Sequence, residues 1–193
     1  MKERILNRIH RALEHRPSAE LPQPLQPESI SQTEAVALFI ERLTGNGGEV
    51  VKLANLGAAR EWLEQFTQTF SGVAVSKLVP QTLHPKLPVM SPEEAPLGIS
   101  WGLGAVAETG TVLVSSREGR RTQLLPPTHI VFVPQEKVWG NLSDAFAELK
   151  QDLPAAIGLH SGPSRSADIG QIVVKGVHGP GRIIAALIEK PGD

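Results

Sequence analysis

Helical and strand-like patterns alternate along the first half of the chain, and this alternation limits the folds available to it. The order is a capped helix from Ser31, a strand at residues 48–54, a helix through residues 62–70 and a strand at residues 72–79. Because helices that alternate with strands cover the faces of a sheet, the pattern predicts a three-layer α/β fold with an open, mostly parallel sheet.

The pattern changes after residue 80, where shorter strands are separated by turns. Strands are expected at residues 106–107, 111–115, 129–133, 155–159, 172–175 and 182–188, with one further helix at residues 141–149. The loops between such short strands are long enough to build a binding site.

Residues 1–28 differ from the rest of the chain and are predicted to form an arm. Apolar residues at helical spacing run from Ile5 to Leu13, with basic residues elsewhere on the wheel. Four prolines at residues 17–27 end this helix and favour an extended linker. The α/β domain is therefore expected at residues 29–193. We interpret the helix as docking on its own domain or on a second copy, a homo-oligomer, with membrane or nucleic-acid contact as the alternative.

The charge balance and the residues that are absent argue against several classes of function. The 19 Lys and Arg residues against 20 Asp and Glu residues give no electrostatic reason to expect nucleic acid as a partner. No apolar run is long enough for a membrane span, and no signal-peptide core follows Met1, so we expect a cytoplasmic protein. Without cysteine, the chain cannot hold an iron–sulfur cluster through thiolates or use a cysteine nucleophile.

Residues 161–168 form the densest group of candidate ligand contacts, just after an apolar strand pattern. Arg165 can hold a carboxylate or phosphate through two donors, and Asp168 can orient its guanidinium. A helical turn beginning at Ala167 would add main-chain N–H groups. The alternative is a serine-rich helix cap with an Arg165–Asp168 surface ion pair. The other predicted contacts of this segment are Ser161, Gly162, Ser164 and Ser166.

A second candidate group is Glu108-Thr109-Gly110-Thr111, between an apolar segment and a β-branched strand. Gly110 would let the backbone approach a ligand closely, and the hydroxyls of Thr109 and Thr111 can bind an oxyanion. Glu108 is a candidate proton acceptor. The alternative is a bulge or hairpin turn in which Glu108 faces solvent or caps a helix.

Two of the six histidines stand at predicted strand ends. His129 begins an apolar strand, and His178 precedes Gly179 in a glycine-rich turn. Either imidazole can act as a general base because its ordinary pKa lies near neutrality, whereas a hydrogen-bonded structural role is the alternative. The other histidines show no metal-ligand spacing, so we predict no metal site in this chain.

Five segments, taken together and in this order, resemble the LUD-domain family: residues 107–111, 124–126, 129–130, 161–169 and 176–180. The resemblance is dense over roughly residues 98–189. It implies a domain similar to the NagB/RpiA/CoA-transferase-like α/β fold. It also implies a part in oxidising L-lactate to pyruvate together with iron–sulfur partner proteins.

The leading hypothesis is a subunit of a lactate-oxidising system that binds a small carboxylate such as lactate. Arg165 would hold the carboxylate, and Glu108, His178 or His129 would take the hydroxyl proton. This chain carries no cofactor in the hypothesis, and the iron–sulfur clusters belong to partner subunits. Two alternatives stay open: a CoA-transferase-like or sugar-phosphate-isomerase-like enzyme with Glu108 as nucleophile or base, and a non-catalytic assembly or ligand-sensing subunit.

Overall fold

A parallel sheet forms the centre of the structure, a computed structural model that describes residues 2–14, 30–167, 173–176 and 178–192. All neighbouring strands in this sheet are parallel. The predicted α/β class with a mostly parallel sheet is confirmed. In spatial order the strands are β1 (Glu49–Asn55), β11 (Arg182–Lys190), β6 (Thr128–Pro134), β3 (Leu97–Trp101) and β2 (Ala74–Val75).

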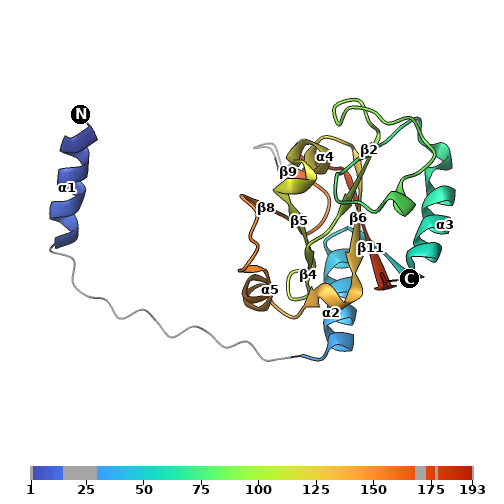
Figure 1. Cartoon of the computed structure of the whole chain (residues 1–193), viewed down its shortest axis with the longest axis horizontal. Coiled ribbons are helices and arrows are strands. Elements are labelled where there is room, and N and C mark those ends of the chain that lie inside the picture. Colours follow the sequence, from blue (N-terminus) through green and yellow to red (C-terminus); the bar gives the residue numbers. More distant parts are fainter. Residues whose placement is uncertain (1, 15–29, 168–172, 177, 193) are drawn as a thin grey trace.

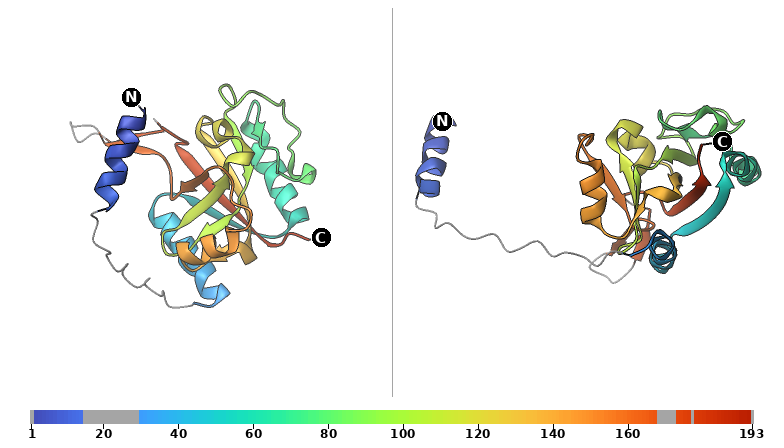
Figure 2. Two further views of the ribbon diagram at one scale, coloured as in Figure 1. Left: turned by 60° about the vertical axis from the view of Figure 1, so that its left-hand side comes forward. Right: turned by 60° about the horizontal axis from the view of Figure 1, so that its bottom comes forward.

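Helices cover both faces of this sheet, as alternation of helix and strand predicts. Helix α3 packs on one face of the sheet and α2 on the other. Figure 1 and the right-hand view of Figure 2 show α5 on the opposite side of the body from α3. The helices are α1 (Lys2–Glu14), α2 (Gln32–Gly45), α3 (Leu56–Phe66), α4 (Arg120–Leu124) and α5 (Leu142–Leu149). Short 3-10 turns are η1 (Thr67–Thr69), η2 (Gln81–Leu83), η3 (Ser116–Glu118) and η4 (Gln135–Lys137).

A second, smaller sheet packs beside the parallel one and was not separated from it by the sequence patterns. Its order is β7 (Val138–Trp139), β4 (Gly104–Val106), β5 (Thr111–Ser115) and β8 (Ile157–His160). The β4–β5 and β5–β8 pairs are antiparallel. A separate antiparallel hairpin joins β9 (Arg165–Ala167) to β10 (Val173–Lys175).

The strand predicted at residues 72–79 is limited to β2, Ala74–Val75, and the structure differs from the sequence predictions at two other places. The helical turn expected from Ala167 is wrong, because Ala167 ends β9 and pairs with Val173 across the hairpin. Strand β3 was not predicted, since Gly98 and Ser100 interrupt its apolar pattern. Glycine is needed there because a Cβ on Gly98 would lie 2.7 Å from the Thr122 main-chain oxygen.

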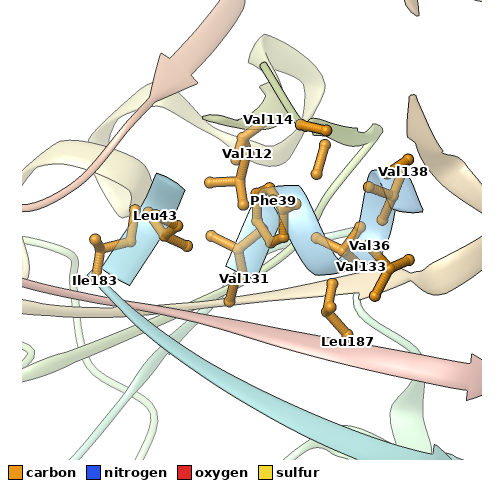
Figure 3. Close-up of a cluster of buried hydrophobic side chains, with 14 residues drawn as sticks. Val36, Phe39, Leu43, Val112, Val114, Val131, Val133, Val138, Ile183 and Leu187 are labelled. Atoms are coloured by element: carbon orange, nitrogen blue, oxygen red, sulfur yellow. The ribbon is translucent and has the colours of Figure 1, made fainter. Parts of the chain in front are cut away.

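Helix α2 fills the space between the two sheets. Its capping box is formed in both directions, with Ser31 and Glu34 each bonding the other's main-chain N–H. From α2, Phe39 and Leu43 are fully buried. Figure 3 shows Phe39 between Val112 of the second sheet and Val131 of the parallel sheet. Burial of this apolar face therefore joins the two sheets through one helix.

The opposite face of the parallel sheet is covered by α3. Trp62 and Phe66 stack with ring centroids 5.1 Å apart, and Phe66 stacks on Phe70 at 5.4 Å. The predicted helical spacing of these rings is confirmed up to Phe66, after which η1 replaces the α-helix. No helix among the described residues has the length and hydrophobicity required to cross a membrane.

Replacing Phe39 by alanine should destabilise the whole body, because it opens a cavity between the two sheets. We expect the free energy of unfolding to fall by about 3–5 kcal/mol in urea titrations. Glu41→Ala, on the exposed face of the same helix, is the control and should change it by less than about 0.5 kcal/mol. Equal effects of the two substitutions would contradict this account of the core.

Candidate functional site

An open hollow of about 460 Å³ lies where β8 ends and the last turn of α2 meets the following chain. We call it the Arg165 hollow. Its position agrees with the prediction that candidate contacts cluster where a strand ends. The lining residues are Gly45, Asn46, Leu159, Ser161, Gly162, Pro163 and Arg165.

A chain of three hydroxyl groups joins two of the predicted segments beside this hollow. The Thr109 and Thr111 Oγ1 atoms are 2.6 Å apart, and Thr111 Oγ1 is 2.5 Å from Ser161 Oγ. Each hydroxyl has one proton, so two hydrogen bonds use two of the three protons. The third remains available to donate to an anion.

The guanidinium of Arg165 is held at the edge of the hollow by the end of α2. Its Nη2 donates to the Asn46 main-chain oxygen at 2.9 Å. Gly47 has a φ of 88°, and a Cβ there would collide with the same Nη2. Glycine at residue 47 therefore serves both the left-handed backbone and the position of Arg165. Within the described ranges, no carboxylate forms an ion pair with Arg165.

The third predicted segment reaches the same region through Ser164. The Ser164 N–H donates to the Pro180 oxygen at 2.8 Å, and the Gly176 N–H donates to the Ser164 oxygen at 2.9 Å. The Ser164 hydroxyl accepts the His178 N–H at 3.4 Å. Gly179 packs on Ser164, since a Cβ on that glycine would lie 3.3 Å from the serine Cβ. Ser164 thus connects the two loops, and the exposed His178 is placed on the second of them.

The loop at residues 108–111 packs mainly on protein rather than on open space. Glu108 is exposed, and its Oε1 accepts the Leu142 N–H at 2.8 Å at the start of α5. This is the helix-capping arrangement weighed as the alternative. Gly110 has a φ of 61°, and a Cβ there would contact the last turn of α2 at Leu43. The close approach that this glycine permits is therefore to α2.

One further predicted contact lies in the β9–β10 hairpin. Ser166 pairs with Val174 across the hairpin. Asp168 lies outside the described residues, so its predicted role in orienting Arg165 stays a prediction.

His129 lies in the interior, away from the Arg165 hollow. Its side chain is fully buried, and its Nε2 is 2.9 Å from Ser100 Oγ, which is 2.9 Å from Ser76 Oγ. Burial, reinforced by the His160 ring at 5.9 Å, lowers the pKa of His129 to about 3. The ring is therefore neutral near pH 7, and this geometry favours the structural role over that of a general base.

A buried carboxylate belongs to the same polar cluster, and no sequence pattern indicates it. Glu118 is 2% exposed, and its Oε2 accepts the Trp101 N–H at 3.2 Å. Burial raises the pKa of Glu118, and hydrogen bonds, including one from Ser76, oppose that rise. In sequence, Glu118 stands among arginines next to Gly119 and resembles a surface turn. Alternation of apolar residues cannot reveal such a group.

Acidification should destabilise the fold through His129. An unfolded chain protonates this imidazole near pH 6.5, whereas the folded chain resists protonation down to about pH 3. Since the unfolded state then binds more protons, stability falls as pH falls across this window, by up to about 1.4 kcal/mol per pH unit. We expect His129→Gln to flatten the slope of unfolding free energy between pH 6.5 and 5.

The matched control for that measurement is His178→Gln, which removes an exposed imidazole. It should keep the wild-type slope. An identical slope in His129→Gln and wild type would show that the buried ring does not govern the pH dependence.

No group of three or more His, Asp or Glu side chains in the described part of the chain is arranged to hold a metal ion. The groups gathered at the Arg165 hollow are instead hydroxyls, main-chain atoms and one guanidinium. Such a set suits a small oxyanion such as a carboxylate.

Comparisons with known proteins show what this chain is similar to. A family model described as "LUD domain" matches residues 92–188. A protein named "Lactate utilization protein C" from Bacillus licheniformis is 36% identical over 105 residues, covering 50% of this chain and 44% of that protein. The Bacillus subtilis protein of the same name is 38% identical over 104 residues, covering 50% and 43%. Each match thus covers less than half the length of the relative.

A solved structure supports the fold assignment. The crystal structure of a DUF162 family protein from Deinococcus radiodurans superposes with a TM-score of 0.64 at 17% sequence identity. The superposition covers 83% of this chain and 99% of the other. At this identity the likeness concerns the fold alone.

Proposed function

Because the chain belongs to the LUD domain family, we propose that it serves in lactate utilisation and binds a small carboxylate such as lactate in the Arg165 hollow. The names of its relatives support the first part. The observation that carries the second part is the meeting of an Arg165 guanidinium, free of carboxylate partners in the described ranges, with the Thr109–Thr111–Ser161 hydroxyl chain.

The proposed binding mode follows from the donors around the hollow. A guanidinium has five N–H donors, and the bond to Asn46 uses one of them. The remaining donors can bind both oxygens of a carboxylate side by side. The spare proton of the hydroxyl chain then donates to the substrate oxygen. A 2-hydroxy or 2-keto acid would form one more polar contact with these donors than a simple carboxylate would.

The electrostatics of the site make Arg165 indispensable in this proposal. The hollow lies at the C-terminal end of α2, where main-chain carbonyls carry partial negative charge and repel anions. That repulsion is about 0.3–1 kcal/mol, whereas charge-assisted hydrogen bonds contribute about 1.5–3 kcal/mol. One arginine therefore outweighs the helix end.

Oxidation of lactate to pyruvate releases two electrons and two protons, and this chain has no cysteine with which to hold an iron–sulfur cluster. We therefore assign the electrons to iron–sulfur clusters of partner subunits in a cytoplasmic complex. His178 is the proposed acceptor of the hydroxyl proton, since it is exposed on the loop that Ser164 anchors. The hydrogen at C2 leaves with its electron pair to the partner subunits, where the clusters take the electrons and the proton passes to solvent. The Glu108 carboxylate is bound to the start of α5.

Arg165→Ala tests the binding proposal. We expect its dissociation constants for L-lactate and pyruvate, measured by calorimetry, to rise at least about tenfold. Arg60→Ala, on the exposed side of α3, is the control and should bind as the wild type does. Equal affinities of all three proteins would refute the role of Arg165.

Activity should follow binding in the reconstituted system. With the partner subunits present, Arg165→Ala should need at least about tenfold more lactate than the wild type for half-maximal dye reduction. Unchanged rates at every lactate concentration would rule out the Arg165 hollow as the substrate site.

Gly47→Ala provides an independent test that removes no polar group from the site. The added methyl group would occupy the position of Arg165 Nη2, so the guanidinium must move. We expect weaker lactate binding, together with a loss of stability of about 1 kcal/mol or more from the left-handed backbone. Gly192→Ala is the control, because nothing lies within 4 Å of its added Cβ and it does not line the hollow.

A further inference from the structure

We propose that α1 docks in a groove on the body of a second copy of this chain, so that two copies exchange their N-terminal helices. The groove has a volume of about 440 Å³ and is lined by Glu136, Lys137, Trp139, Glu148 and Leu149. We call it the α5 groove. It shares no lining residue with the Arg165 hollow, so this inference does not rest on lactate binding.

The first observation is that α1 carries an uncovered apolar face. Ile5, Leu6, Ile9 and Leu13 are each between 42% and 55% exposed, and no residue of the helix is buried. Figure 1 shows α1 standing apart from the α/β body. An isolated helix of 13 residues is only marginally stable in water, and its apolar side chains gain from burial. The helix therefore requires a partner surface.

The α5 groove complements α1 in polarity and charge. Trp139 and Leu149 give it an apolar part, and Glu136 and Glu148 are exposed carboxylates beside one ammonium, Lys137. In the described ranges neither glutamate forms an ion pair. Residues 2–14 carry four Lys and Arg residues against two Glu. An apolar, basic helix thus fits an apolar, mainly acidic groove.

A further observation is the place where the chain enters the body. Gln32 Nε2 donates to the Gln135 and Val138 oxygens, at 2.7 and 3.2 Å, and Ile30 packs on Gly140. The chain therefore enters the body directly beside the α5 groove. The 15 residues from 15 to 29 can span at most roughly 50 Å. In a twofold dimer, two arms can cross from one groove to the other over that reach.

Exchange of both helices also helps to meet the area that a specific interface needs. Stable protein interfaces bury about 1,200 Å² or more in total. A twofold arrangement forms the helix-to-groove contact twice, so it buries twice the area that docking of a single helix would bury. The commitment to a second copy follows from this doubling and from the separation of α1 from its own body.

The oligomeric state of the full chain tests the proposal. We expect a dimer in sedimentation experiments, with its dissociation constant raised at least tenfold by Ile9→Glu and by the double variant Glu136→Lys, Glu148→Lys. The double variant Glu41→Lys, Glu61→Lys, on exposed positions of α2 and α3, is the matched control and should dimerise as the wild type does. Urea unfolding of Ile9→Glu should match wild type for the body, since α1 buries no residue.

Cross-linking then locates the contact, and the absence of cysteine makes it specific. A mixture of Arg8→Cys and Glu148→Cys chains should form a disulfide-linked heterodimer, whereas Arg8→Cys and Glu61→Cys should not. The proposal is overturned if the wild type is monomeric, if Ile9→Glu stays dimeric, or if the first mixture does not cross-link. A cross-link formed only with both cysteines in one chain would place α1 in its own groove. A monomer that binds anionic vesicles through α1 would make the partner a membrane.

Discussion

The packing of α2 between the two sheets fixes the positions of the surface loops that rest on this helix. Its apolar face, with Phe39 and Leu43 fully buried, contacts the parallel sheet on one side and β5 on the other. A helix held on two sides has little freedom at its last turn. The loop of Gly110 rests on that turn, and Asn46 donates from its side chain to the Thr109 oxygen. The positions of the groups that line the Arg165 hollow therefore depend on apolar side chains that are buried several residues away.

Apolar periodicity explains why the fold class could be predicted from the sequence, whereas the inner strand β3 could not. Periodicity identifies an element when one face is apolar, and α2 and α3 satisfy this condition. Strand β3 has residues buried on both faces, yet Gly98 and Ser100 stand in it for reasons of packing and polarity. Gly98 makes room for the Thr122 oxygen, and Ser100 bonds His129. Both residues are explained by contacts with residues distant in sequence, so a local sequence pattern cannot reveal them.

The candidate site shows the same division between local and tertiary information. The three polar segments were found from residue type alone, and the structure brings them together through Ser161 and Ser164. The sequence could not show which hydrogen bonds each group forms. Glu108 binds a helix end and Ser164 accepts a main-chain N–H, because their neighbours come from segments distant in sequence. Residue type predicts capacity for hydrogen bonding, whereas topology selects the partner.

Strand β8 separates two polar environments that the sequence places side by side. Leu159 lines the Arg165 hollow, whereas His160 lies against His129 in the interior. This follows from the alternation of side chains along a strand. The interior pair is desolvated, which lowers the pKa of both imidazoles. Within the described residues no chain of hydrogen bonds joins the Arg165 hollow to His129. The exposed His178 stands on the solvent side.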